Sequence, residues 1–306
     1  MRTFQLLIDG GHLIRRIAFT PQGQLTTSNG DPSGLAHGFF SSLIYLSRQY
    51  AGNARAYVAF DSGVSKYRSD IYSDYKCKRE DLTSPDYTGP DIHTAKKYIK
   101  AVLNIVGIPC FMVPGIEADD FIAALSYHFP EDTVVISSDQ DFFQLVTDGV
   151  TMFDPIRKVT YDVDKIVGDT YDRDCWVDQY ILHKCIIGDK DEVPSLVKGL
   201  GYVRALPLAK MLSYGCLLPT ENKYAIGLLE NLENLDRNIQ LFDLQESYRV
   251  LKDEIIAGIN SFVPSKYSGL ELEHGVHTAL SKWELNSVSR NITHLVNLRS
   301  TKPIEI

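Results

Sequence analysis

The 306-residue sequence lacks the features of membrane, secreted and zinc-binding proteins. No run of about 18 apolar residues is present to span a membrane, and the apolar run at residues 4–8 is too short for a signal-peptide core. The five cysteines are an odd number and include no Cys-x-x-Cys pair. This pattern favours reduced thiols over disulfides or structural zinc. We therefore expect a cytoplasmic protein.

Three common catalytic motifs are also missing. The sequence has no Gly-x-x-x-x-Gly-Lys phosphate loop. The run Asp9-Gly-Gly11 lacks the second aspartate that an aspartyl-phosphate phosphatase places there, and Ser137-Ser138 lie outside any Gly-x-Ser-x-Gly elbow. These absences argue against a P-loop hydrolase, this class of phosphatase and an α/β-hydrolase.

The charge balance gives no sign of a nucleic-acid enzyme. The formal net charge is −8, with 39 acidic and 31 basic residues, whereas phosphate-binding proteins are usually basic. Two divalent ions bound to clustered carboxylates would cancel about four units of negative charge locally. The distribution of the acids therefore matters more than their sum.

Apolar runs and helical periodicity alternate in the first part of the chain. Strands are predicted at residues 4–8, 57–60, 108–113 and 134–137, and helices at residues 35–49, 92–106 and 119–127. This alternation predicts an α/β fold in which helices cover both faces of a central, mainly parallel sheet.

The pattern changes along the chain. We expect residues 1–172 to form the α/β domain, with a long excursion at residues 63–91, and excursions of this length are usually functional or disordered. From about Trp176 the pattern is almost wholly helical, which predicts a helical C-terminal region at residues 173–262. Residues 263–306 have weak periodicity, and their role stays unassigned.

Carboxylates follow three of the predicted strands. These residues are Asp9, Asp61, Asp139 and Asp141. Two further acidic segments are Glu117-Ala-Asp-Asp120, at a predicted helix start, and Gly188-Asp-Lys-Asp-Glu192, after a predicted helix. Because the C-terminal ends of parallel strands lie along one edge of a sheet, where ligands bind, the strand-end acids are expected to gather there.

Each of these acids has a plain structural interpretation as a turn former or helix N-cap. Taken together they indicate more, since two carboxylates ~4 Å apart repel by roughly 4 kcal/mol at an effective dielectric constant near 20. Oxygen ligands without His or Cys select Mg²⁺ or Mn²⁺. Two such ions can activate a water molecule and stabilise the attacking and leaving oxygens of a phosphoryl displacement.

Two other segments have the chemistry of nucleic-acid contacts. Residues 66–79 are net positive and interleave basic residues with tyrosines, which suits phosphates and stacked bases, although a solvated charged surface is the plain alternative. The segment Val197-Lys-Gly-Leu-Gly201 resembles the hairpin of a helix–hairpin–helix element, in which glycines let backbone N–H groups approach a phosphate. A plain helix C-cap is the alternative there.

Taken in order, these segments resemble the 5′-nucleases of the flap endonuclease family, which includes bacteriophage 5′→3′ exonucleases and the N-terminal nuclease domain of bacterial DNA polymerase I. The matching segments are Leu6-Leu-Ile-Asp-Gly10, Leu25-Thr-Thr-Ser-Asn-Gly-Asp-Pro-Ser-Gly34, Val58-Ala-Phe-Asp61, Tyr67-Arg68, Tyr75-Lys-Cys-Lys-Arg79, Pro114-Gly-Ile-Glu-Ala-Asp-Asp120, Ile136-Ser-Ser-Asp-Gln-Asp141, Gly188-Asp-Lys190 and Val197-Lys-Gly-Leu-Gly201. The combination is highly specific, although Glu-Ala-Asp-Asp alone would be weak.

The resemblance implies a PIN-like 5′-nuclease domain with two Mg²⁺ ions, which Mn²⁺ can replace. The implied metal ligands are Asp9, Asp61, Glu117, Asp119, Asp120, Asp139, Asp141 and Asp189. It also implies that Lys76 and Arg79 act in catalysis and that residues 63–91 form an arch over the active site. The implied nucleic-acid contacts are Tyr67, Arg68, Tyr75, Lys78, Lys198, Gly199 and Gly201. A monovalent cation at the hairpin is a further expectation.

One segment departs from the family pattern. The family typically reads Gly-Asp-Lys-Ser-Asp-Asn, whereas this chain reads Gly188-Asp-Lys-Asp-Glu-Val193. Without gaps Glu192 takes the place of the second metal-binding aspartate, and with a one-residue slip Asp191 does. Both residues remain candidates for the last metal ligand.

The implied function is structure-specific 5′→3′ exonuclease or flap endonuclease activity that removes primers or flaps during DNA replication. The expected partners are branched or 5′-ended DNA, RNA/DNA hybrids and replication proteins. We expect a monomer without membrane contact, in the host cytoplasm if the chain is of phage origin. The alternatives are a PIN-type ribonuclease and a catalytically inactive flap-binding protein.

Overall fold

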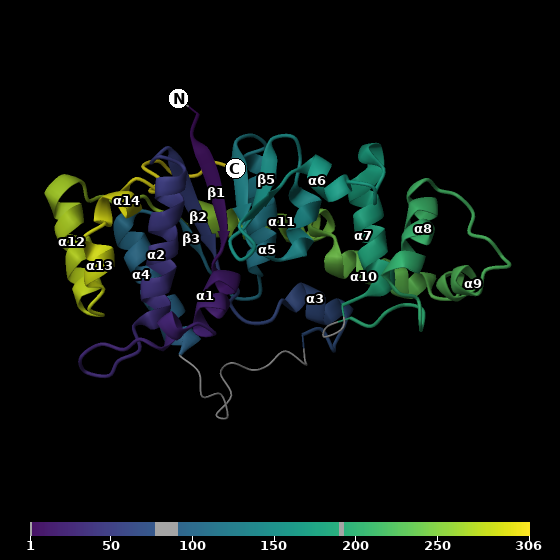
Figure 1. Ribbon diagram of the computed structural model, residues 1–306, viewed down its shortest axis with the longest axis horizontal. Coiled ribbons are helices and arrows are strands. Elements are labelled where there is room, and N and C mark those ends of the chain that lie inside the picture. The colour runs from purple at the N-terminus through teal and green to yellow at the C-terminus, as the bar shows by residue number, and fades with distance from the viewer. Residues whose placement is uncertain (1, 77–90, 190–192) are drawn as a thin grey trace.

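A computed structural model describes residues 2–76, 91–189 and 193–306 of the chain. Its centre is a six-stranded sheet with the strand order β3-β2-β1-β4-β5-β6 (Figure 1). The strands are β1 (Phe4–Asp9), β2 (Ala54–Ala59), β3 (Cys110–Phe111), β4 (Thr133–Ile136), β5 (Val150–Asp154) and β6 (Val159–Tyr161). The first five strands are parallel, and β6 pairs antiparallel with β5. The mainly parallel sheet predicted from the sequence is confirmed.

Strand β1 shows why the sheet is covered on both faces. Leu6, Leu7 and Ile8 are each fully buried, as expected for a central strand of a parallel sheet. Successive side chains of a strand point to opposite faces. Accordingly, Leu6 and Ile8 lie in one hydrophobic core and Leu7 lies in another.

Helices from distant parts of the chain cover the two faces. The first core is built with α1 (Gly10–Ala18), α2 (Gly34–Gln49) and α4 (Ile92–Val106), and the second with α5 (Ala118–His128) and α11 (Leu244–Asn260). The helix predicted at residues 92–106 is confirmed at both ends. Its N-cap Asp91 accepts a hydrogen bond from the backbone of Thr94, and Gly107 ends it with a φ of +89°.

The helices that extend beyond the sheet share a third hydrophobic core. These are α7 (Trp176–Ile187), α8 (Tyr202–Ser213), α9 (Lys223–Leu229) and α10 (Leu232–Phe242). They lie on the side of the sheet away from α2 and α4 (Figure 1). Short elements near this part and the sheet edge are α3 (Lys66–Ile71), α6 (Val163–Val167), and the 3₁₀ helices η2 (Gln140–Leu145) and η3 (Arg173–Cys175), whereas the 3₁₀ helix η1 (Pro21–Gln24) packs on α1 and α2.

The last part of the chain packs on the first helices. It contains α12 (Gly269–Ser281), α13 (Asn286–Ser289) and α14 (Ile292–Val296), which lie beside α2 and α4 (Figure 1). Leu272, Val276 and Leu280 follow one another at four-residue intervals and are buried in the first core. That spacing is the signal of one apolar helix face. None of the helices within the described ranges is long and apolar enough to cross a membrane.

Candidate active site

Four aspartates lie at the C-terminal edge of the sheet. Asp9 ends β1, Asp61 follows β2 and Asp139 follows β4. Because the order β2-β1-β4 makes these strands neighbours, their ends lie side by side. Asp119, in the first turn of α5, interacts electrostatically with all three. The structure thus brings together the strand-end acids that the sequence predicts.

Backbone and hydroxyl donors fix these carboxylates. Asp9 caps α1 by accepting a hydrogen bond from the His12 N–H at 2.8 Å, and its second oxygen accepts one from the Ser137 hydroxyl at 3.0 Å. Asp61 accepts from the Ala118 N–H at 2.9 Å. Asp139 is the N-cap of η2 and accepts from the backbone of Asp141. The structural interpretation as helix caps is therefore confirmed for Asp9 and Asp139.

The negative charges of the cluster repel one another. Burial raises the pKa of Asp9 to about 6. The charges of Asp61 and Asp139 also raise it, whereas the hydrogen bond from the His12 backbone lowers it. Burial also raises the pKa of Asp119 well above its usual value, and the same neighbouring aspartates add to it. At Asp61 burial acts in the same direction, but nearby cations, above all Lys76, and the Ala118 N–H lower its pKa.

The donor set of this cluster fits divalent cations. All four side chains offer oxygen only, which suits Mg²⁺ or Mn²⁺. No described residue donates a hydrogen bond to the Asp119 carboxylate. A Cβ at Gly11 would lie 3.6 Å from Asp9 Oδ1 and 3.8 Å from Asp61 Oδ2, so a glycine leaves space beside both carboxylates. Within the described ranges, no three acidic, His or Cys side chains already converge on one metal position, as repulsion between like charges would predict.

Glu117 is held by cations instead of facing the cluster freely. The Lys76 amine lies 2.8 Å from Glu117 Oε1, and the Arg68 guanidinium lies 3.4 Å from Oε2. The Tyr75 hydroxyl donates to the same Oε2 at 3.2 Å. Lys76 has a φ of +57°, which is uncommon for a residue other than glycine. A metal ion would compete with Lys76 for Glu117.

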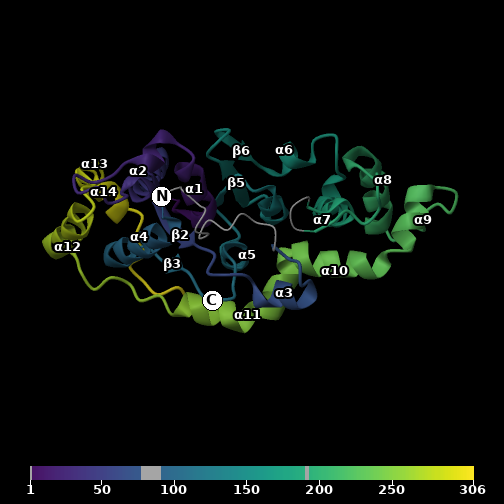
Figure 2. The same ribbon diagram turned by 90° about the horizontal axis from the view of Figure 1, so that it is seen from below.

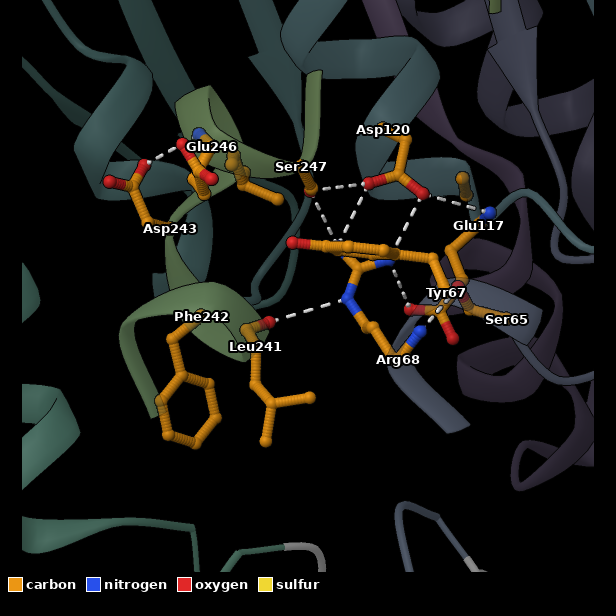
Figure 3. Close-up of polar contacts among 12 residues, drawn as sticks. Ser65, Tyr67, Arg68, Glu117, Asp120, Leu241, Phe242, Asp243, Glu246 and Ser247 are labelled. Carbon is orange, nitrogen blue, oxygen red and sulfur yellow. Dashed lines mark hydrogen bonds and ion pairs between the residues drawn. The ribbon is translucent and has the colours of Figure 1, made fainter. Parts of the chain in front are cut away.

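Two predicted roles are corrected by the structure. Asp120 was expected among the metal ligands, but both its oxygens accept hydrogen bonds from Arg68, at 2.8 and 3.0 Å, and it is fully buried (Figure 3). Arg68 was expected to contact nucleic acid, but it is only 2% exposed. Tyr75, another expected contact, is 7% exposed and faces Glu117. Asp120 is therefore occupied by Arg68 and does not face the carboxylate cluster, and burial argues against nucleic-acid contacts by Arg68 and Tyr75.

A second group of acids lines a pocket next to the cluster. The pocket has a volume of about 510 Å³, and its lining includes Asp139, Asp141, Lys184 and Asp189. Lys184, from α7, forms an ion pair with Asp141. Burial lowers the pKa of Lys184, although the negative charges of Asp139, Asp189 and Asp119 act in the opposite direction and raise it.

Sequence reasoning missed two lysines near the carboxylates. Lys184 lies one helical turn before Gly188, and this position beside the Gly-Asp-Lys segment is the signal that it faces the same pocket. Lys96, from α4, donates to the backbone oxygen of Asp61 at 3.2 Å. No local pattern marks Lys96, because its approach to Asp61 depends on how α4 packs.

The remaining predicted contacts lie in two places. The Tyr67 hydroxyl donates to the Gln240 backbone at 3.3 Å. Lys198 and Gly199 are exposed shortly before α8, and Gly201 is the N-cap of α8. Gly199 has a φ of +77°, and a Cβ at Gly199 or Gly201 would meet nothing within 4 Å. The predicted residues Lys78, Arg79, Asp191 and Glu192 lie outside the described residues.

Comparisons with known proteins identify nucleases as relatives of this chain. The family model of the 5′-3′ exonuclease N-terminal resolvase-like domain matches residues 5–172. A 5′-3′ exonuclease of Aquifex aeolicus is 29% identical over 259 residues, which are 82% of each chain. The thermostable DNA polymerase I of Thermus thermophilus is 32% identical over 239 residues, or 76% of this chain but only 25% of the polymerase.

Solved structures share the fold at lower identity. The flap endonuclease of bacteriophage T5, in a complex with DNA and metal ions, is 21% identical with a TM-score of 0.63, over 96% of this chain and 99% of that one. The flap endonuclease of Methanococcus jannaschii is 16% identical with a TM-score of 0.62, over 97% and 93%. With the family model matching more than half of its residues, the chain belongs to the family of 5′-3′ exonucleases with an N-terminal resolvase-like domain.

Proposed function

We propose that the protein is a structure-specific 5′-nuclease that acts as a 5′→3′ exonuclease and flap endonuclease on DNA. The observation that carries this proposal is the cluster of Asp9, Asp61, Asp119 and Asp139 at one edge of the sheet, in a chain of this family. Clustered negative charge weakens DNA binding unless cations neutralise it. A metal-dependent hydrolase explains the cluster, whereas a protein that only binds DNA does not.

Two Mg²⁺ ions are the proposed cofactors, and Mn²⁺ can replace them. Asp9, Asp61, Asp119 and Asp139 would hold them, with Glu117, Asp141 and Asp189 around this set. When bound, such ions generate a hydroxide nucleophile and stabilise the attacking and leaving oxygens. Asp9 and Asp61 are already oriented by backbone N–H groups, so little reorganisation is needed at that edge.

Lys76 is the proposed catalytic residue among those described. Its amine lies 2.8 Å from Glu117 and acts electrostatically on Asp61 and Asp119, so it borders the carboxylate cluster. With Glu117 among the residues that would hold metal, the Lys76 amine would be free to stabilise negative charge on the scissile phosphate. Arg79 is proposed for the same task from the sequence pattern.

The proposed substrates are branched or 5′-ended DNA and RNA/DNA hybrids, with removal of primers or flaps in replication as the biological role. Residues 197–201, just before α8, would hold duplex DNA through backbone N–H groups as a helix–hairpin–helix element, and a monovalent cation is proposed there. Residues 63–91 would contact the single strand. We further propose a cytoplasmic monomer that acts beside replication proteins.

A 5′-labelled flap substrate tests this function. In Mg²⁺ we expect cuts near the junction of single strand and duplex, with 5′-phosphate and 3′-hydroxyl products. Chelation should abolish cleavage, and added Mg²⁺ or Mn²⁺ should restore it. Asp139→Asn should lower the rate by about 100-fold or more and leave DNA binding intact, because bound metals supply several kcal/mol of transition-state stabilisation.

Other outcomes would favour other functions. Preferential cleavage of a 3′ flap, or full activity in excess chelator, would contradict the proposal. Cleavage of RNA alone would favour a PIN-type ribonuclease. Tight flap binding in Mg²⁺ without any cleavage would favour a catalytically inactive flap-binding protein.

A further inference from the structure

Arg68 is a fully paired, buried cation beside the proposed active site. It lies in α3 and is 2% exposed. Its two terminal nitrogens donate to the two oxygens of Asp120, at 2.8 and 3.0 Å, and one of them also donates to the Ser247 hydroxyl at 3.1 Å. Its Nε donates to the backbone oxygen of Leu241 at 3.3 Å, so every guanidinium nitrogen has a partner (Figure 3).

This arrangement is specific to arginine. A buried charge is tolerated only when it is paired and hydrogen-bonded, and a planar guanidinium matches a carboxylate with two parallel bonds. Lysine would keep the charge of Arg68 but lose the fork geometry and the bond to the Leu241 backbone. The site is therefore built around one particular side chain.

The network joins three parts of the chain that are distant in sequence. Arg68 lies in α3, Asp120 lies in the first turn of α5, and residues 241–247 span the end of α10 and the first turn of α11. The Tyr67 hydroxyl adds a bond to Gln240 at the end of α10. Figure 2 shows α3 beside the end of α10 and the start of α11. The start of the segment 63–91 is thus fastened to the C-terminal helices.

The same network reaches Glu117 in two ways. Asp120 accepts a hydrogen bond from the Glu117 backbone N–H at 3.1 Å, and the two residues form a capping box at the start of α5. Arg68 lies 3.4 Å from Glu117 Oε2, on which the Tyr75 hydroxyl also converges. Both the backbone and the carboxylate of Glu117 are therefore oriented by the Arg68–Asp120 pair.

We propose that Arg68 is a positioning residue for the metal site, which holds Glu117 and the first turn of α5 in the metal-binding arrangement by locking α3 and residues 241–247 against them. This inference rests on the proposed function, because it requires that Glu117 and Asp119 bind metal. Partners that orient metal ligands usually matter almost as much as the ligands themselves. The alternative is that Arg68 only stabilises the fold.

Metal binding by the folded, DNA-free protein separates these two roles. We would titrate Mn²⁺ into the full-length protein by calorimetry and record the thermal midpoint in chelator for each variant. Arg68→Lys should weaken Mn²⁺ binding by about tenfold, in the range found when outer partners of metal ligands are removed. Ser247→Ala removes one hydroxyl from the network and should give a smaller loss, of about twofold to threefold.

Val276→Ala is the matched control for stability. Val276 is fully buried in α12, in the hydrophobic core on the other face of the sheet from α5. Its truncation leaves a cavity and should lower the thermal midpoint without changing Mn²⁺ affinity. The inference is overturned if Arg68→Lys lowers the midpoint as Val276→Ala does and binds Mn²⁺ like the wild type.

The outcomes also separate this inference from the proposed function. If the wild type binds no Mn²⁺ and cleaves no flap, the proposed function fails and the inference fails with it. If the wild type binds and cleaves while Arg68→Lys and Ser247→Ala both keep wild-type Mn²⁺ affinity, only the positioning role fails. If Arg68→Lys does not fold, Ser247→Ala decides, and unchanged Mn²⁺ affinity in that variant rejects the positioning role.

Discussion

Asp119 and Asp120 are neighbours in the sequence, but they lie in opposite electrostatic surroundings. Asp119 faces Asp9, Asp61 and Asp139, and burial together with their charges raises its pKa well above the usual value. Asp120 is fully buried against Arg68, which donates to both its oxygens. Successive residues of a helix point about 100° apart, so one turn of α5 serves both clusters.

The two clusters differ in where their neutralising charge comes from. Around Glu117 and Asp120, two carboxylates meet two basic side chains, Arg68 and Lys76, so the protein supplies its own cations. Around Asp119 three carboxylates raise its pKa and Lys76 lowers it, and no basic side chain forms an ion pair with it among the described residues, so a bound cation would be stabilised there. The motif Glu117-Ala-Asp-Asp120 thus contributes Asp119 to a proposed metal site and Asp120 to an ion pair within the protein.

Isosteric replacement of the two aspartates gives the largest contrast. Asp119→Asn should slow cleavage by about 100-fold or more and raise the thermal midpoint in chelator, because it removes a repelled charge. Asp120→Asn should lower the free energy of unfolding by about 3–5 kcal/mol, since it leaves Arg68 without its charged partner. Flap cleavage rates and urea unfolding in chelator measure both effects.

The control for this pair is Asp148→Asn, an exposed aspartate whose loss should change neither property. The contrast between the clusters is refuted if Asp119→Asn destabilises the metal-free protein as strongly as Asp120→Asn does. It is also refuted if Asp120→Asn leaves the free energy of unfolding at the wild-type value.

Lys76 and Gly201 allow a second, smaller contrast between chemistry and binding. Lys76→Ala should slow cleavage by about tenfold or more and leave duplex affinity nearly unchanged, because Lys76 acts at Glu117. Gly201→Ala should weaken duplex binding by blocking close approach of the backbone. A Cβ there meets no protein atom within 4 Å, so the change adds no clash within the protein.

Single-turnover rates and binding titrations on the same flap measure this pair. Gly199→Ala is a poorer probe, because its φ of +77° makes any side chain strained. If Lys76→Ala and Gly201→Ala lower rate and affinity equally, the division between the two regions does not hold.

The smallest expected effect concerns the last metal ligand. Glu192→Gln should raise the Mg²⁺ concentration needed for half-maximal cleavage, whereas Asp191→Asn should be mild, because the ungapped family pattern places Glu192 at the ligand position. A glutamate is one methylene longer than an aspartate, and Mg²⁺ keeps several waters that absorb a small shift. Titration of Mg²⁺ beside Asp189→Asn checks this. An Asp191→Asn defect as large as that of Asp189→Asn, with Glu192→Gln near normal, would assign the ligand to Asp191.

The sequence predicted the parts of the fold that have strong local signals. The helix Ile92–Val106 and the strands β1 to β4 were found because apolar periodicity and helix caps are local. Strands β5 and β6 were missed. β5 is short and interrupts its apolar residues with Thr151, and β6 has only three residues, none fully buried. The helices within residues 263–306 were left unassigned, although Leu272, Val276 and Leu280 pack in the first core.

The sequence by itself determined that Asp9, Asp61 and Asp139 lie at one edge of the sheet, because they follow parallel strands whose C-terminal ends share that edge. Only the tertiary structure decided that Asp120 turns away from them. Its partner Arg68 is 52 residues away, and the other partners of Arg68, Leu241 and Ser247, are 173 and 179 residues from it. A buried ion pair depends on how distant helices pack and how fully they exclude water, and no local pattern of residues encodes either property.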